Sequence, residues 1–453
     1  MSFRAAFHTL GCKTNHYETD ALRAQFTHAG FDVVPFTEQA DVYLVNTCTV
    51  TGEADRKSRQ MLRRARQKNP GALVVALGCQ VVLGDAADWA DLTIGTEGKS
   101  QAIDHVLRAL TGRRLVELPL GVDAALPPVH NIQDSAAGRT YDEFGPVAHQ
   151  SETRAYVKIE DGCNNFCSYC AIPFARGRVR SRGHDQIMAE IRALATAGYR
   201  EIILTGIHLC SYGLDRGLPG HAIMELALEI ADVGVIERIR LGSLEPLSVT
   251  PEFIRLAAQN PKLCPQFHLS LQSGSDTVLA RMSRRYRTAD YREVVTGLRG
   301  SFADPGITTD LIVGFPGETD EEFADSLAFC KEMAFTRMHV FRFSARQGTR
   351  AAIMPDQVSP GLIGRRSKSM LELAGQMSLD YNRRQVGRIH TVLVERLAGG
   401  HLTGYTPEYV PIRLSAGGDP SVPDPAPGSI LRVRGTRAEA EILLCERAET
   451  DIS

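Results

Sequence analysis

The stretch Asp161-Gly-Cys163-Asn-Asn-Phe-Cys167-Ser-Tyr-Cys170 decides the fold of this 453-residue chain. Its three thiols stand at Cys-x3-Cys-x2-Cys spacing, just after a run at 155–159 that predicts a β-strand. Three thiolates on one short loop can hold three irons of a four-iron cluster and leave the fourth iron open to a substrate. Two alternatives remain: buried free thiols, or a zinc site, which would need a fourth ligand that does not follow at finger spacing. The polar residues between the cysteines favour the cluster.

The chain after this loop alternates apolar runs with amphipathic stretches, a pattern typical of βα units. The candidate strands are 155–159, 201–205, 238–241, 266–271, 308–313 and 337–343. The candidate helices between them are 186–197, 251–259, 291–298 and 321–333. Six strands in this alternation favour an open partial (βα)6 barrel over a closed eight-stranded one, and we expect it to span residues 151–384.

The cysteine spacing, with the aromatic Tyr169 before the last thiol, resembles the hallmark of the radical S-adenosylmethionine superfamily. The resemblance implies a 4Fe-4S cluster on these three cysteines. It also implies that S-adenosylmethionine chelates the open iron through its amino and carboxylate groups. Contacts to this cofactor are then expected from Tyr169, Gly206 and Ser243.

A second set of cysteines lies in the first 117 residues, which predict an open, mostly parallel α/β sheet. The candidate strands there are 4–10, 41–46, 73–77 and 92–95. Cys12, Cys48 and Cys79 each follow one of these strands, so all three should gather at the carboxyl edge of the sheet. The alternative is that each is a small apolar residue at a strand end, which is weaker for three residues than for one.

The flanks of these cysteines resemble the radical S-adenosylmethionine methylthiotransferase family. The similar segments are Thr9-Leu-Gly-Cys12-Lys-Thr-Asn15, Asn46-Thr-Cys48-Thr-Val-Thr51 and Leu77-Gly-Cys79. The resemblance implies a second 4Fe-4S cluster, held by Cys12, Cys48 and Cys79, that carries a sulfide. It also implies that one S-adenosylmethionine methylates this sulfide and a second supplies a deoxyadenosyl radical, so that a methylthio group is added to the substrate.

Three substrates compete within that family. They are N6-threonylcarbamoyladenosine and N6-isopentenyladenosine beside the tRNA anticodon, and an aspartate of a small ribosomal subunit protein. The segment Asn46-Thr-Cys48-Thr-Val-Thr51-Gly-Glu-Ala-Asp55-Arg-Lys57-Ser-Arg59-Gln60 is most similar to the threonylcarbamoyladenosine branch. Thr14, His16 and the run 344–347 depart from the family pattern, which bears on the substrate and not on the reaction.

Other readings of the cysteines belong to different classes of protein. A non-catalytic iron-sulfur regulator that binds RNA and a zinc-bearing RNA adaptor both fit the same residues. An enzyme of this kind would also need an electron donor, such as a flavodoxin or a ferredoxin. The source of the sulfur is not indicated by the sequence.

The remaining segments flank the two cysteine-bearing regions. Residues 118–150 lack periodicity and contain four prolines, which predicts a linker. Residues 385–449 change to short β-rich pieces broken by Gly and Pro, which predicts a small five-stranded barrel of the oligonucleotide-binding kind. This tail is similar to the RNA-binding TRAM domain, and we expect it to grip the tRNA anticodon stem-loop.

The numbers of basic and acidic residues are nearly equal over the whole chain, but two segments contain basic residues and no acidic ones. Lys plus Arg total 51 against 53 Asp plus Glu, so the net charge of -2 gives no global steering toward RNA. Seven cations without an acid lie in 56–68, and four arginines lie in 176–182. We interpret both runs as phosphate contacts. The residues predicted to contact RNA are Arg56, Lys57, Arg63, Arg64, Arg176 and Arg178.

Composition excludes several other classes. Ten cysteines are too few for a disulfide scaffold in a chain of this length. Residues 1–15 do not resemble a secretory signal, and the apolar run at 72–83 is shorter than the roughly 20 residues that cross a bilayer. We therefore expect a cytoplasmic protein without a membrane partner. The four cysteines without ligand spacing are expected to be structural: Cys210, Cys264, Cys330 and Cys445.

Overall fold

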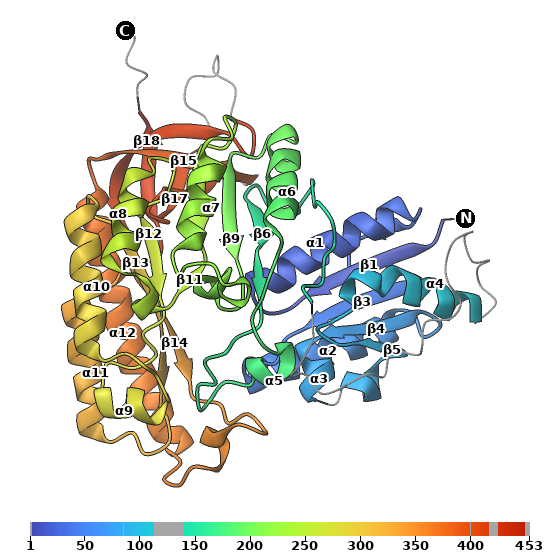
Figure 1. The fold of residues 1–453 in the computed structure, drawn as a ribbon, viewed down its shortest axis with the longest axis horizontal. Helices are drawn as coiled ribbons and strands as arrows, with labels where there is room; N and C mark the ends of the chain where they lie inside the picture. The colour runs from blue at the N-terminus through green and yellow to red at the C-terminus, as the bar shows by residue number, and fades with distance from the viewer. Residues whose placement is uncertain (1, 85, 113–139, 399, 416–424, 449–453) are drawn as a thin grey trace.

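The computed structural model describes residues 2–84, 86–112, 140–398, 400–415 and 425–448. Residues 118–139 of the predicted linker lie outside the described residues. The chain folds into an N-terminal sheet, a central open barrel and a C-terminal closed barrel (Figure 1). This arrangement confirms the predicted α/β fold class.

The N-terminal sheet has five parallel strands in the order β2-β1-β3-β4-β5. The strands are β1 (Arg4–Thr9), β2 (Asp32–Val34), β3 (Val42–Thr47), β4 (Leu73–Gly78) and β5 (Leu92–Ile94). The helices are α1 (Lys13–His28), α2 (Gly52–Lys68), α3 (Cys79–Leu83) and α4 (Ala102–Gly112). Helices α1 and α4 pack on one face of the sheet and α2 on the other, so β3 and β4 are buried throughout. Burial on both faces explains their unbroken apolar sequence.

The central barrel is an open arc of parallel strands in two sheets, β10-β9-β6 and β11-β12-β13-β14. An isolated parallel bridge between Ile239 and Leu263 connects the two sheets. The strands are β6 (Ala155–Lys158), β9 (Glu201–Thr205), β10 (Arg238–Leu241), β11 (Ser243–Leu244), β12 (Gln266–Leu269), β13 (Gly306–Val313) and β14 (Arg337–Arg342). All six predicted strands are present, and β11 adds a two-residue segment after β10.

Helices cover the outside of this arc (Figure 1). They are α6 (His184–Thr196), α7 (Ala222–Ala231), α8 (Pro251–Gln259), α10 (Thr288–Ser301), α11 (Asp320–Met333) and α12 (Pro360–Gln385). Shorter elements lie near the cysteine loop: β7 (Glu160–Asp161), β8 (Arg180–Ser181), α5 (Ile172–Arg176) and α9 (Asp276–Arg281). Helix α7 was not predicted, although its two acidic residues, Glu225 and Glu229, stand four residues apart among buried apolar ones.

The C-terminal barrel is closed, in the order β15-β16-β17-β19-β18. Its strands are β15 (Ile389–Ala398), β16 (His401–Tyr405), β17 (Pro411–Ser415), β18 (Ile430–Ala438) and β19 (Leu443–Arg447). Alternate apolar residues of these strands form one core, as expected for a small barrel. The predicted five-stranded barrel is therefore confirmed.

This barrel packs against the amino ends of the central strands. Arg240 Nη1, on β10, donates to the carbonyl oxygen of Pro407 at 2.8 Å, and Arg238 Nη1 donates to that of Tyr405 at 3.1 Å. A Cβ atom on Gly306, the first residue of β13, would overlap the carbonyl oxygen of Glu408. The C-terminal barrel therefore closes one end of the central arc and leaves the carboxyl ends of its strands to the cysteine loops (Figure 1).

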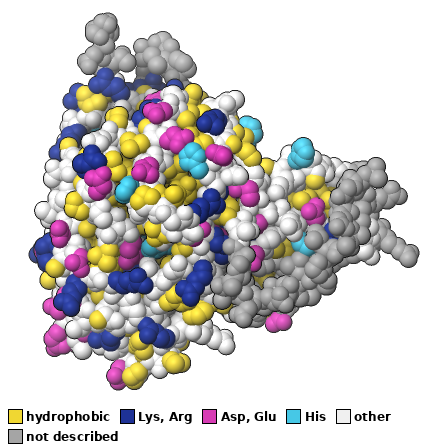
Figure 2. Space-filling view, in the orientation of Figure 1, with side chains coloured by type: hydrophobic (Ala, Val, Ile, Leu, Met, Phe, Trp, Pro, Cys, Tyr) yellow, Lys and Arg dark blue, Asp and Glu magenta, His cyan; other side chains and the backbone are white. Residues whose placement is uncertain are grey.

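The drawn surface of the molecule carries both cations and acids (Figure 2). On the face drawn in Figure 2, cations and acids are interspersed over the helices, in keeping with the nearly neutral total. Within the described parts of the chain, no helix is both long enough and apolar enough to span a bilayer.

Candidate functional site

The first cysteine loop leaves β7 and closes on the start of α5. Gly162 has a φ of +92°, and a Cβ atom there would overlap the carbonyl oxygen of Arg178, so only glycine fits this crossing. The backbone N–H of Asn165 donates to Cys163 Sγ at 3.4 Å, and Arg284 Nη1 donates to Cys167 Sγ at 3.2 Å. Donors aimed at sulfur are what a thiolate-bound cluster requires.

The second set of cysteines converges at the carboxyl edge of the N-terminal sheet, as predicted. Cys12 caps α1, Cys48 follows β3, and Cys79 is the first residue of α3. A Cβ atom on Gly11, whose φ is +103°, would lie 2.9 Å from Cys48 Sγ, so the first two loops touch. Burial, together with the neighbouring Cys79 and Cys12, raises the pKa of the Cys48 thiol to about 12.

The donor sets fit clusters better than a single ion. Among the described residues, no three His, Cys, Asp or Glu side chains are placed to hold one metal ion. In a four-iron cluster each thiolate ligates its own iron, so the sulfurs need not converge on one point. Burial also raises the pKa of the Cys163 and Cys170 thiols to about 12. Both would therefore be protonated until a metal displaces the protons.

One cavity, of about 310 Å³, is lined by residues next to both sets of cysteines. Val50 and Thr51, just after Cys48, line it together with Tyr169 and Cys170. Ends of the barrel strands supply most of the other walls, including Ile207, Ser243, Gln272, Asp310, Phe343 and Ser344. The predicted cofactor contacts Tyr169 and Ser243 thus lie in this cavity.

Gly206 contributes by lacking a side chain. A Cβ atom there would lie 2.7 Å from Glu160 Oε2, so glycine allows this carboxylate to approach the end of β9. Glu160 is buried, and its Oε1 has no hydrogen-bond partner among the described residues. Burial raises its pKa to about 8. Its Oε2 accepts from the backbone N–H of His208 at 2.8 Å, so Oε1 is the oxygen left for a cation such as the ammonium group of S-adenosylmethionine.

A ring of polar side chains around the first cysteine loop was not predicted. Asn165 Nδ2 lies 3.0 Å from His208 Nε2, and His208 Nε2 lies 3.7 Å from Glu245 Oε2. Glu245 pairs in turn with Arg284 at 2.7 Å, which completes the path back to Cys167. Glu245 belongs to a strand-end motif visible in the sequence, but His208 and Arg284 carry no such signal.

The loop that carries Cys48 is held by the end of the central barrel. The backbone N–H of Gly52 donates to Ser344 Oγ at 3.1 Å, and Arg346 Nη2 donates to Thr49 Oγ1 at 2.6 Å. Arg346 also pairs with Asp55. These contacts fix the second set of cysteines relative to the first.

The contacts that Ser344 and Arg346 make with the Cys48 loop are called the clamp below. A second, polar cavity of about 450 Å³ lies beside it. Arg59, Asp55 and Arg346 line it, together with Gln80 next to Cys79 and Ala171 next to Cys170. Asp55 Oδ1 and Arg346 Nε are buried without a hydrogen-bond partner among the described residues. Such groups indicate space for a polar ligand.

The basic run on α2 is exposed, as predicted. Arg63 and Arg64 are exposed, and with Arg56 and Arg59 they line a groove of about 630 Å³. Arg56 and Lys57 pair with Glu53, and these exposed pairs are weak. This face therefore offers cations to a polyanion.

The second basic run is mostly buried, and the prediction that Arg176 contacts RNA is wrong. Arg176 has no exposed surface and pairs with Glu18 and Asp161. Arg180 and Arg182 are buried as well. Arg178 remains exposed, with its guanidinium 4.5 Å from the ring centre of Phe166. Carboxylates distant in the sequence account for the burial.

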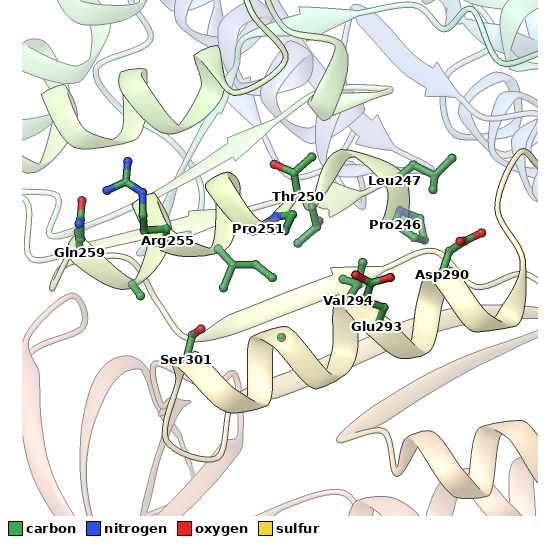
Figure 3. Close-up of a pocket in the computed structure, with 14 residues that line it drawn as sticks. Pro246, Leu247, Thr250, Pro251, Arg255, Gln259, Asp290, Glu293, Val294 and Ser301 are labelled. Atoms are coloured by element: carbon green, nitrogen blue, oxygen red, sulfur yellow. The ribbon is translucent and has the colours of Figure 1, made fainter.

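A larger cavity lies on the outer surface, between helices α8 and α10 (Figure 3). It measures about 710 Å³, and Pro246, Thr250, Arg255 and Glu293 are among its lining residues. No cysteine lines it. We assign it no role in the chemistry.

The fold and site define a radical enzyme whose cavity is lined by Cys170 of the first triad and by Val50 and Thr51, which follow Cys48 of the second. Residues 157–330 match the family described as "Radical SAM superfamily", and residues 4–87 match "Uncharacterized protein family UPF0004". The chain is 36% identical over 416 residues to Threonylcarbamoyladenosine tRNA methylthiotransferase MtaB of Bacillus subtilis (strain 168), which covers 90% of this chain and 89% of that protein.

It is also 32% identical over 454 residues to tRNA-2-methylthio-N(6)-dimethylallyladenosine synthase of Acidothermus cellulolyticus, covering 97% of this chain and 87% of that protein. The chain therefore belongs to the radical S-adenosylmethionine tRNA methylthiotransferase family. Among solved structures, the radical S-adenosylmethionine methyltransferase TsrM from Kitasatospora setae matches with a TM-score of 0.54 and 16% identity. That match covers 78% of this chain and 77% of TsrM, and it supports the fold alone.

Proposed function

We propose that this enzyme adds a methylthio group to C2 of N6-threonylcarbamoyladenosine beside the anticodon of tRNA. The observation that carries the proposal is the cavity lined by Thr51, three residues after Cys48, and by Cys170. A base bound there would lie within reach of both triads. A tRNA substrate also implies that the enzyme works in the cytoplasm.

Each triad would hold a 4Fe-4S cluster. Cys163, Cys167 and Cys170 would hold the radical cluster with S-adenosylmethionine, and Cys12, Cys48 and Cys79 would hold an auxiliary cluster. When bound, these groups supply a carbon radical and a methylated sulfur. An external electron donor, such as a flavodoxin or a ferredoxin, would reduce the clusters.

The chain's own residues bind and orient. Glu160, which can approach the end of β9 because Gly206 lacks a side chain, would accept the ammonium group of S-adenosylmethionine. Tyr169 and Phe343 would offer aromatic faces to an unstacked base. The clamp from Ser344 and Arg346 keeps the auxiliary triad at a fixed distance from the base. Holding the reacting groups in this orientation supplies much of the reduction in the activation free energy.

The polar cavity beside the clamp favours the threonylcarbamoyl substrate over the isopentenyl one. The threonyl group carries a carboxylate, and Arg59 and Arg346 place two guanidinium groups in that cavity. An isopentenyl group would carry no carboxylate for these cations, and it would leave Asp55 Oδ1 and Arg346 Nε, which are buried without a hydrogen-bond partner among the described residues, unsatisfied. An aspartate of a ribosomal protein would not require the aromatic rings of Tyr169 and Phe343 in the cavity of about 310 Å³.

We expect Arg59→Met to lower kcat/KM for tRNA that carries threonylcarbamoyladenosine by about tenfold to a hundredfold. The reason is the loss of a charge-assisted hydrogen bond, which is worth about 1.5 to 3 kcal/mol. Initial rates of methylthio-nucleoside formation would measure the loss. Arg59→Lys, which keeps the charge, should retain more activity. If tRNA lacking the threonylcarbamoyl group suffers an equal loss, Arg59 contacts the RNA backbone instead.

The groove on α2 and the C-terminal barrel would bind the anticodon stem-loop. We expect Arg63→Ala with Arg64→Ala to flatten the plot of log affinity against log salt by about 1.4, since each phosphate contact to single-stranded RNA contributes about 0.7. Binding of labelled tRNA across a salt series would measure the slope. Arg365→Ala with Lys368→Ala, which removes equal charge from exposed positions on α12, should leave it unchanged. An unaltered slope in the α2 variant would make that groove an ordinary solvated face.

Mass spectrometry of tRNA nucleosides tests the function directly. A cell that lacks this protein should lose 2-methylthio-N6-threonylcarbamoyladenosine and regain it on complementation. If the methylthiolated isopentenyladenosine disappeared instead, the substrate of this enzyme would be N6-isopentenyladenosine. No change, with iron near four rather than about eight per chain, would favour an RNA-binding iron-sulfur regulator.

A further inference from the structure

Six charged side chains lie buried between the two cysteine triads. They are Glu18, Lys99, Lys158, Asp161, Arg176 and Arg180. Four of them are cations and two are carboxylates, and Arg180 also lies 3.9 Å from the less buried Glu97, so the group keeps an excess of one positive charge when all seven are ionised. Buried charge of one sign is costly unless a counter-charge lies nearby.

Arg176 is at the centre of this group. Its Nη1 donates to Glu18 Oε1 at 2.9 Å and to Asp161 Oδ1 at 3.0 Å, and its Nη2 donates to Asn15 Oδ1 at 2.6 Å. Glu18 and Asn15 belong to α1 of the N-terminal sheet, whereas Asp161 ends β7 of the central region. One guanidinium group therefore bonds to both cysteine-bearing parts of the chain.

These contacts continue to the backbone beside the cysteines. Asn15 Nδ2 donates to the carbonyl oxygen of Leu10 at 2.7 Å and to that of Thr47 at 3.0 Å. Leu10 is two residues before Cys12, and Thr47 immediately precedes Cys48. On the other side, Asp161 stands two residues before Cys163. A displaced Arg176 would consequently release the loops of both triads.

The charges agree with this position. Lys99 Nζ would lie 3.3 Å from a Cβ atom on Gly78, the residue before Cys79, so a second cation lies beside the auxiliary triad. A 4Fe-4S core of charge +2 with three thiolates carries a net charge of about −1. The excess positive charge thus complements the cluster proposed for the auxiliary triad.

We propose that Arg176 is a positioning residue that fixes the two cluster sites relative to one another and supplies the positive charge that stabilises the reduced auxiliary cluster. This inference rests on the proposed function, because both triads must hold clusters. It differs from an ordinary buried ion pair in what its loss would change. A purely structural pair would alter stability but neither the reduction potential nor the coupling between the triads.

The chain offers a matched control in Arg182. This arginine is also buried, and it pairs with Glu190 and Glu143, neither of which adjoins a cysteine of the triads. Arg176→Met and Arg182→Met each remove one buried guanidinium from ion pairs. A general loss of packing or stability would affect both variants alike.

The test combines anaerobic redox titration, followed by electron paramagnetic resonance, with measured ratios of deoxyadenosine to methylthio product. For Arg176→Met we expect a more negative potential for the auxiliary cluster, because a nearby cation favours the reduced form. We also expect about tenfold more deoxyadenosine per product, since the base and the two triads lose their alignment. Arg182→Met should match the wild type in both measurements.

Arg176→Lys keeps the positive charge but loses the planar guanidinium group and its several donors. It replaces Arg176→Met in the test if that variant fails to fold. Its potential should return to the wild-type value while the product ratio stays raised. Equal behaviour of the two Met variants, an unshifted potential in Arg176→Met, or a wild-type product ratio in Arg176→Lys would overturn the inference. A wild-type protein with about four irons per chain would instead overturn the proposed function itself, so the two failures are distinguishable.

Discussion

Cys163→Ala will abolish formation of deoxyadenosine, whereas Cys48→Ala will preserve it and stop transfer of sulfur to tRNA. The two residues belong to different triads, one on the loop after β7 and the other at the end of β3. Loss of one thiolate from a three-thiolate cluster site removes the ligand set for that cluster only. Product analysis by liquid chromatography and mass spectrometry, with S-adenosylmethionine and tRNA present, separates the two activities.

Cys330→Ala is the appropriate control for this pair. Cys330 is fully buried in the barrel core and belongs to neither triad, so its replacement should cost stability but leave both products. Iron analysis should show about half the wild-type content in each triad variant and full content in the control. Deoxyadenosine from the Cys163 variant would contradict the assignment of roles.

Gly162→Ala will prevent assembly of the radical cluster and so abolish both products. The φ of +92° at this position is unfavourable for any residue with a Cβ, at about 1 to 2 kcal/mol. The larger effect comes from the overlap with the carbonyl oxygen of Arg178, which must move the whole cysteine loop. Visible absorbance and iron content after anaerobic reconstitution measure the loss.

Gly198→Ala isolates the backbone effect from the overlap. Gly198 has nearly the same φ, +90°, but no atom lies within 4 Å of an added Cβ. This variant should lose some thermal stability, keep both clusters and retain activity. If Gly162→Ala behaves in the same way, the close crossing at Arg178 does not control cluster assembly.

The sequence predicted the sheet edges better than the polar network between them. Cys12, Cys48 and Cys79 could be placed together because parallel strands end at a common edge, whatever the details of packing. The three-residue edge strand β2 was missed, whereas β5, which is equally short, was predicted. Fold class and the two triads therefore followed from local pattern and spacing.

The buried arginines could not be inferred in the same way. Arg176 lies 158 residues from Glu18, and Arg182 lies 39 residues from Glu143. A run of arginines looks the same in sequence whether it meets phosphates or distant carboxylates. Only the fold shows which partner each guanidinium finds, and the same holds for His208 and Arg284 around the first cysteine loop.

The C-terminal barrel lies at the amino ends of the central strands, whereas the cavity opens at their carboxyl ends. An RNA molecule that touches both must follow the outer wall of the arc, past strands of four to eight residues, or about 13 to 26 Å at 3.3 Å per residue. If the barrel grips the anticodon stem-loop as proposed, its distance from the cavity would set the length of folded RNA that the enzyme accepts, and would favour an intact anticodon arm over a short single strand.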